Sequence, residues 1–149
     1  ANLYNREFYE TAARRLTEGG VLSQWIQLHH TTLTEVASQL TTARAVFAHA
    51  ALFLRGQGVL VMSNSPLQAR PGADLADLVL ADETIDQFVD DVCRRQGVSR
   101  QSLISTDDNL RLEYATPRDN VAADADAAGV ERALMDHRRP EVAARLRAR

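Results

Sequence analysis

The chain has 149 residues, of which 45% are hydrophobic and 25% charged, and its net charge at pH 7 is −3. This composition indicates one globular domain with a hydrophobic core, and the acidic balance argues against nucleic acid as a partner, although all 17 basic residues are arginines. A single cysteine, Cys93, forms no internal disulfide, so a cytoplasmic setting is expected.

The sequence contains no segment that is typical of a membrane span. Its most apolar run, residues 45–54, is far shorter than the roughly 20 residues that cross a bilayer. The N-terminal residues also lack the basic and then apolar pattern of a signal peptide. We therefore expect the chain to be soluble as given.

The first third of the sequence predicts alternating helix and strand. Asn5 can cap a helix whose apolar residues recur at four-residue spacing, and the glycine pair at 19–20 ends it. The run VLSQWIQL, at 21–28, is mostly apolar and rich in strand-forming residues. Such a run predicts a strand that is covered on both faces within a parallel sheet.

The next segment predicts a capped helix and then a hairpin. Thr32 and Glu35 have the spacing of a capping box, in which each side chain accepts a hydrogen bond from an exposed backbone N–H of the first turn. The runs ALFL at 51–54 and VLVMS at 59–63 are separated by a short glycine-containing turn. They predict two antiparallel strands.

Beyond residue 63 the pattern is less regular. Residues 64–72 predict a loop, and a short segment with spaced apolar residues follows at 74–80. Asp82 is expected to cap a helix that Gly97 closes.

The last third begins with a turn. Residues 105–109 form a cluster of Ser, Thr, Asp and Asn, and an alternating strand at 110–114 follows and ends at Pro117. From residue 124 onward we expect Ala- and Arg-rich helices with a break at Pro140. Their thin apolar face suggests a peripheral arm.

Three ordered blocks of this sequence resemble the spermidine synthases, the polyamine aminopropyltransferases. The blocks are LYNREFYETAARRLTEGGVLSQWIQL at 3–28, VFAHAALFLRGQGVLVMSNSPL at 46–67 and STDDNLRLEYATPR at 105–118. They are most similar to a large bacterial subgroup in which a spermidine-synthase-like domain is joined to a membrane portion.

The resemblance implies an α/β fold class: the C-terminal part of a Rossmann-like, class I methyltransferase-like fold. It implies a small mixed sheet with a terminal antiparallel hairpin, followed by C-terminal helices. On this basis residues 1–67 are the C-terminal part of the aminopropyltransferase domain. Residues 68–118 are then a helical extension with a short strand, and residues 119–149 are the peripheral arm.

The same resemblance implies that the reaction's main groups lie upstream. In the family, decarboxylated S-adenosylmethionine sits on a Gly-rich turn, an acidic residue holds its ribose, and an aspartate loop orients or deprotonates the attacking amine. This chain has no G-x-G-x-x-G motif, and its glycines at 56–58 indicate a hairpin turn. We therefore expect an inactive C-terminal fragment, with no catalytic residue and no bound cofactor, of an enzyme that acts on a small-molecule polyamine. Any membrane contact would come from a segment of the parent outside this chain.

Residues at the end of the 21–28 strand are candidates for the rim of the substrate site. Ligands bind at the carboxyl ends of parallel strands, which here points to Gln24, Gln27, His29 and His30. The resemblance implies that a Gln on this strand helps to line the amine pocket. Gln24 is the nearest match, but it lies one residue closer to the glycine than is usual and lacks the usual acidic neighbour. Solvated residues at a strand-to-helix junction are the alternative interpretation.

Other chemistry-bearing residues have structural interpretations. His29 and His30 point in opposite directions on an extended segment, with no further ligand at metal spacing, so no metal site is expected. His49 is expected to be partly buried, and Cys93 to be unreactive. The pair Asp107 and Asp108 could bind a cation or an amine, but a turn that satisfies its own backbone is favoured.

Two other functions stay open. The parent could be a diverged S-adenosylmethionine-dependent, methyltransferase-like protein with another acceptor. The chain could also be a non-catalytic interaction module, because a strand at 21–28 without its upstream neighbour has an unpaired edge. For that reason we expect a homo-oligomer formed through the exposed sheet edge.

Overall fold

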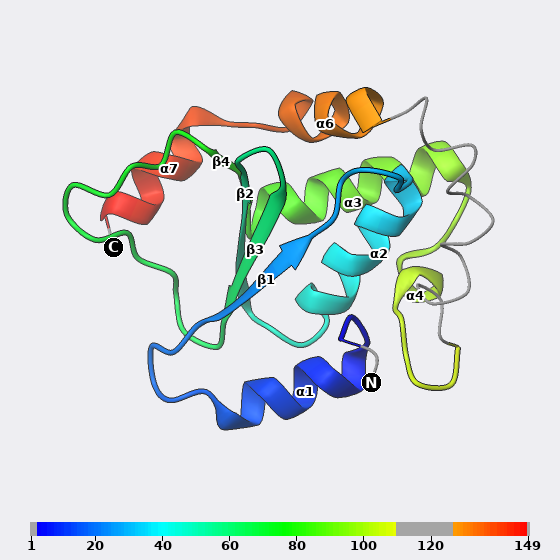
Figure 1. The fold of residues 1–149 in the computed structure, drawn as a ribbon, viewed down its shortest axis with the longest axis horizontal. Helices are drawn as coiled ribbons and strands as arrows, with labels where there is room; N and C mark the ends of the chain where they lie inside the picture. Colours follow the sequence, from blue (N-terminus) through cyan, green and yellow to red (C-terminus); the bar gives the residue numbers. More distant parts are fainter. Residues whose placement is uncertain (1–2, 110–126, 149) are drawn as a thin grey trace.

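The computed structural model describes residues 3–109 and 127–148 (Figure 1). Within them, six helices surround one four-stranded sheet. The helices are α1 Arg6–Arg15, α2 Leu33–Arg44, α3 Glu83–Gln96, α4 Arg100–Leu103, α6 Ala127–Asp136 and α7 Pro140–Ala148. The strands are β1 Leu22–Ile26, β2 His49–Leu54, β3 Gly58–Ser63 and β4 Leu78–Ala81.

The strands lie in the order β1-β3-β2-β4, and each neighbouring pair is antiparallel. Trp25 of β1 faces Val59 of β3, and Val59 in turn faces Phe53 of β2. Because β1 and β2 are both antiparallel to β3, they run in the same direction, and α2 connects them. The α/β class is confirmed, whereas the expected mixed sheet is wrong, since these four strands form an antiparallel sheet.

The expectation that the 21–28 run is a parallel strand covered on both faces is also wrong. β1 lies at the edge of the sheet, and only alternate residues of the run are turned to the core. Ile26 and Leu28 are buried. The exposed alternate residues are Val21, Ser23, Trp25 and Gln27. The two-residue period of a half-covered strand therefore explains the polar members of this mostly apolar run.

Three of the predicted helix ends are confirmed, whereas α1 ends at Arg15, before the glycine pair at 19–20 that was expected to end it. The side chain of Asn5 accepts a hydrogen bond from the backbone N–H of Phe8 at 2.9 Å. At the start of α2, the Glu35 N–H donates to Thr32 Oγ1 at 3.2 Å, and the Thr32 N–H donates to a Glu35 carboxylate oxygen at 2.7 Å. Gly97 ends α3 with a φ of 64°, in the left-handed region that glycine adopts without strain.

The predicted hairpin is confirmed as well, but a fourth strand was missed. β2 and β3 pair along their whole length, and the turn between them contains Gly56 with a φ of 67°. The segment at 74–80 leads into β4, all four residues of which are buried beside β2. A run of only four apolar residues has no periodicity that separates strand from loop.

Two clusters of buried side chains form the core, one on each face of the sheet. Along β2, Ala50 and Leu52 belong to the first cluster, together with side chains of α1, α2, α3 and α6. Ala51 belongs to the second cluster, which α7 and the segment before β4 cover. Figure 1 shows α2 and α3 side by side, with α7 at the opposite side of the sheet.

The C-terminal helices, expected to form a peripheral arm, contribute to both clusters. Val130 and Leu134 of α6 are fully buried, and Val142 and Leu146 of α7 are nearly so. The His137 ring, just after α6, meets Phe88 of α3 edge-on, with 5.4 Å between the ring centroids. The strand predicted at 110–114 lies outside the described residues. None of the helices in the described parts of the chain has the length and apolar character needed to cross a membrane.

Candidate functional site

Gln24 lies on the covered face of β1, and both ends of its amide are bonded inside the protein. Its Oε1 accepts a hydrogen bond from the Tyr9 hydroxyl at 2.5 Å, and its Nε2 donates to the Leu3 carbonyl at 2.6 Å. The side chain therefore ties β1 to α1 and to the residues before α1. One lone pair of Oε1 and one N–H of Nε2 remain for an incoming amine.

Tyr9 orients this amide. It is fully buried, and burial raises the pKa of its phenol, with a smaller contribution from Tyr4. The hydroxyl thus stays protonated and acts as a hydrogen-bond donor to Gln24. The sequence pattern did not indicate this bond. The hydroxyl itself could have indicated the bond, because a buried tyrosine usually needs a hydrogen-bond partner.

The other predicted rim residues are separate from Gln24. Gln27 and His29 are exposed beyond the carboxyl end of β1, and His30 follows them with a φ of 56°. Gln24 and Gln27 differ by an odd number of positions, so they leave the chain on opposite sides of the sheet. The structure brings Gln27 and His29 to the same end of β1 but does not gather the three residues into one pocket.

The cluster at 105–109 forms the favoured self-satisfied turn. The Thr106 N–H donates to Asn109 Oδ1 at 2.9 Å, and the Asn109 N–H donates to Thr106 Oγ1 at 3.3 Å. The Asn109 amide also donates to the Ile104 carbonyl at 2.9 Å. Asp107 accepts a hydrogen bond from the Asn5 side chain, so the turn is attached to the start of α1.

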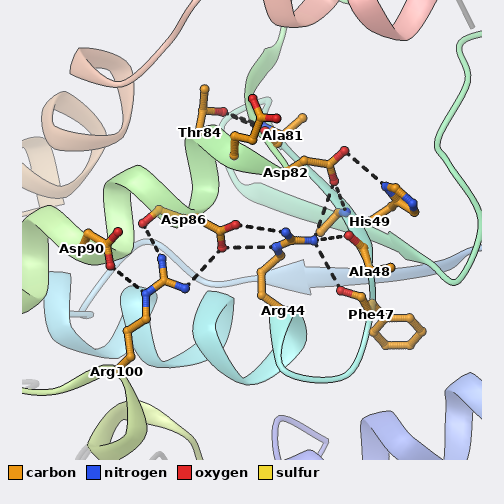
Figure 2. A network of polar contacts seen from close by, with 12 residues as sticks. Arg44, Phe47, Ala48, His49, Ala81, Asp82, Thr84, Asp86, Asp90 and Arg100 are labelled. Carbon is orange, nitrogen blue, oxygen red and sulfur yellow. Dashed lines mark hydrogen bonds and ion pairs between the residues drawn. The ribbon is translucent and has the colours of Figure 1, made fainter.

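A second group of polar residues links α2, β2 and α3 and is centred on Arg44 (Figure 2). The Arg44 guanidinium donates to the two carboxylate oxygens of Asp86 at 3.0 and 3.3 Å. It also donates to the carbonyls of Phe47 and Ala48 and lies 3.8 Å from Asp82 Oδ1. One side chain therefore holds the connection from α2 to β2 against the start of α3.

Asp82 is the second centre of this network. Its Oδ1 accepts a hydrogen bond from the Ala50 N–H at 3.0 Å, and its Oδ2 lies 3.3 Å from His49 Nδ1. Asp82 has a φ of 45°, a backbone conformation that costs free energy for a residue other than glycine. The expectation that its side chain caps α3 is wrong, since the carboxylate bonds β2 instead.

Arg100 extends the network along α3. Its Nε donates to Asp90 at 2.7 Å, and its Nη2 donates to the Asp86 carbonyl at 2.7 Å. Positive and negative groups thus alternate, and each charge named here has a partner of opposite sign. A small pocket beside Asp82 is lined also by Glu83 and Arg145, which form an ion pair at 3.0 Å. This arrangement organises the fold and presents no free nucleophile.

The histidines, the cysteine and the acidic residues are also candidates for metal ligands or nucleophiles. Within 3–109 and 127–148, no three His, Cys, Asp or Glu side chains are grouped so as to hold a metal ion. His49 is half-buried, as predicted, and it lies beside Asp82. The glycines at 56 and 58 belong to the hairpin, so they do not precede a helix. Desolvation raises the pKa of the Cys93 thiol, which lowers the fraction of reactive thiolate.

Comparisons with known proteins identify no relative. No model of a protein family, no curated protein and no solved structure matches the chain.

Proposed function

We propose that the chain is the C-terminal part of a spermidine-synthase-like aminopropyltransferase in the cytoplasm. In that reaction an amine nitrogen of a polyamine takes an aminopropyl group from decarboxylated S-adenosylmethionine. The bond from carbon to the sulfonium sulfur breaks, and a base accepts the proton that the amine loses. On this proposal, upstream residues hold the co-substrate and supply the base. The chain described here completes the sheet and contributes to the acceptor side.

The observation that carries the proposal is the arrangement of α1, β1, α2 and the β2–β3 hairpin. It has the element order that the resemblance implies: helix, strand, capped helix and terminal hairpin. β1 and β2 run in the same direction and are joined by α2, as in the units whose carboxyl ends hold ligands in α/β proteins. A fold of this kind supports many chemistries, so the assignment to polyamines rests on the sequence resemblance.

Residues at the carboxyl end of β1 support a role at the acceptor side. Gln27 and His29 are exposed there and supply hydrogen-bonding groups without a net negative charge. Gln24 lies earlier in the same segment, within β1, and Tyr9 holds its amide in one orientation. A glutamine that is fixed in this way orients an amine at a low cost in conformational entropy.

A second candidate function is favoured by one observation. The Gln24 amide is already bonded at both ends, to Tyr9 and to Leu3. A parent in which this glutamine is purely structural would be a diverged protein that binds an adenosyl cofactor but another acceptor, such as a methyltransferase-like protein. The two functions predict different ligands for the same domain.

The test is isothermal titration of two polypeptides with decarboxylated S-adenosylmethionine and with putrescine. One is the 149-residue chain, and the other is the same chain extended by the sequence that precedes it in its gene. We expect both compounds to bind the longer polypeptide and neither to bind the 149-residue chain. Binding of the co-substrate by the 149-residue chain, or no binding of putrescine by the longer one, contradicts the proposal. Binding of S-adenosylmethionine instead supports the second candidate.

Variants of the longer polypeptide separate a rim residue from a structural one. Gln27→Ala and His29→Ala are expected to weaken putrescine binding about tenfold while leaving co-substrate binding unchanged. Ser23→Ala, an exposed substitution on the same strand, is the matched control. Equal effects of the rim variants and the control would exclude Gln27 and His29 from the acceptor site.

A further inference from the structure

α7 is attached to the sheet by a shallow contact. Two of its nine residues, Val142 and Leu146, are buried, and they lie one helical turn apart in the second core cluster. The pocket beside Asp82 lies between these two side chains and the end of β4, so α7 does not fit closely there. The ion pair of Arg145 with Glu83 adds little stability, because the two side chains are 49% and 71% exposed.

The segment at 66–76 depends on α7 for its own contacts. It contains no helix or strand, and its leucines belong to the second core cluster or pack against it. The Ala69 N–H donates to the Leu146 carbonyl at 2.9 Å, and the Arg147 guanidinium donates to the Ala73 carbonyl at 3.4 Å. These backbone groups lose their partners when α7 leaves the sheet. We call α7 and residues 66–76 together the strap.

α6, the preceding helix, is held by the other core cluster. Val130 and Leu134 are fully buried and belong to the first cluster, with side chains of α3. The His137 ring also meets Phe88 of α3 edge-on. Residues 137–139 join α6 to α7, and Figure 1 shows the two helices as separate bodies along this stretch. The boundary between the two clusters therefore falls at 137–139.

The two clusters differ in size. Among the described residues, the first has 22 buried members and the second has six, of which α7 supplies two. Proteins open locally in units, and a unit with few buried apolar contacts opens at a lower free energy than the core. We propose that the strap leaves the outer face of β2 and β4 as one unit, while the sheet, α6 and the first core cluster stay folded.

Opening of the strap changes the surface of the sheet. Ala51 and Phe53 of β2 lie on the face that the strap covers. Their partners in β3 are Val61 and Val59, which are half-buried. Cross-strand partners point to the same face, so opening joins these side chains into one apolar surface. The strap therefore controls access to this part of the sheet. The inference does not depend on the proposed function, because it uses the packing alone.

Amide hydrogen exchange of the 149-residue chain, followed by NMR, tests the strap. A nine-residue helix is unstable by itself in water, so α7 loses its backbone hydrogen bonds once it is detached. We expect the α7 amides and the Ala69 N–H to have similar protection factors, at least about a hundredfold below those of α2 and α3. The protection factors of α6 should exceed those of α7.

One substitution made in two helices separates the strap from the core. Val142→Ala in α7 and Val130→Ala in α6 remove the same two methyl groups from buried positions. Val142→Ala is expected to accelerate exchange in α7 and at Ala69 about tenfold, while the α3 amides keep their rates. Val130→Ala is the matched control and should accelerate exchange in α6 but not in α7 or at Ala69.

Four results would overturn the proposal. Equal protection of α7 and α3 would mean that α7 is released only by global unfolding. An effect of Val142→Ala on α7 but not on Ala69 would show that residues 66–76 do not move with the helix. A Val142→Ala chain without native circular dichroism would show that the core depends on α7. Finally, Val130→Ala that accelerates α7 as strongly as Val142→Ala would show that the two helices open together.

Discussion

Nη2 of Arg44 lies 3.0 Å from Oδ2 of Asp86, which joins the last turn of α2 to the first turn of α3. The Arg44 side chain is only 17% exposed. Its removal leaves the Asp86 carboxylate and the carbonyls of Phe47 and Ala48 partly buried without this hydrogen-bond donor. We expect Arg44→Met to lower the free energy of unfolding by about 2–4 kcal/mol, as measured in urea. Arg94→Met, whose side chain is 75% exposed beside Asp91, should cost less than about 1 kcal/mol. Equal losses would contradict this account.

Asp82 combines a strained backbone with polar contacts to Ala50, His49 and Arg44, and three substitutions separate the strain from the contacts. Asp82→Asn keeps an oxygen for the Ala50 N–H and should cost about 1 kcal/mol. Asp82→Ala loses that acceptor and keeps the strain, so about 2–4 kcal/mol is expected. Asp82→Gly also loses the acceptor but adopts a φ of 45° readily, so its loss should fall between the two. An alanine variant as stable as the glycine variant would show that the backbone is unstrained.

Local chemistry explains which parts of the fold were predictable. Asn5, the Thr32 and Glu35 pair, and Gly97 act on backbone groups within a few residues of themselves, so their pattern alone predicts the helix ends. The β2–β3 hairpin was predictable for the same reason, since its turn is short. The turn at 105–109 likewise satisfies its own backbone, and the sequence pattern is sufficient for it.

Contacts between distant residues explain the rest. The Asp82 carboxylate was expected at its own helix, but it bonds Ala50, which is 32 positions away. The choice of β3 as the partner of β1, in place of a parallel neighbour, depends on the position of the whole hairpin. The hydrogen bond from Tyr9 to Gln24 also joins two elements, so neither residue's immediate neighbours indicate it. The residue types therefore predicted Gln24 as a rim residue but did not predict its hydrogen bond to Tyr9 of α1.

Cys93 is expected to react slowly in the folded protein. Desolvation raises the pKa of its thiol, whereas the positive charge of Arg100 opposes this change. The thiolate is the reactive form, so alkylation by iodoacetamide at pH 8 should be slower in the native chain than in guanidinium chloride. Arg100→Met removes the opposing charge and should slow the native reaction further. A rate that Arg100→Met increases would contradict the assigned electrostatics.

Tyr9 predicts how stability changes at high pH. Burial raises the pKa of the folded phenol above the value of about 10 that it has in the unfolded chain. Below pH 10 both states hold the proton and stability is unaffected. Above it, the unfolded state loses the proton first, so the free energy of unfolding should fall by about 1.4 kcal/mol per pH unit. The chain contains no lysine, so no lysine titration overlaps this range.

Urea unfolding at several pH values between 8 and about 11.5 measures this slope. A Cys93→Ala background removes the one thiol, whose raised pKa acts in the same direction. In that background, Tyr9→Phe should abolish most of the decline above pH 10, because no buried phenol remains to favour the protonated folded state. It should also cost about 1–2 kcal/mol at pH 7, since Gln24 loses a hydrogen-bond donor. Tyr4→Phe, which removes a less buried phenol, should keep the decline. A Tyr9→Phe variant with the original pH dependence would show that another group governs alkaline unfolding.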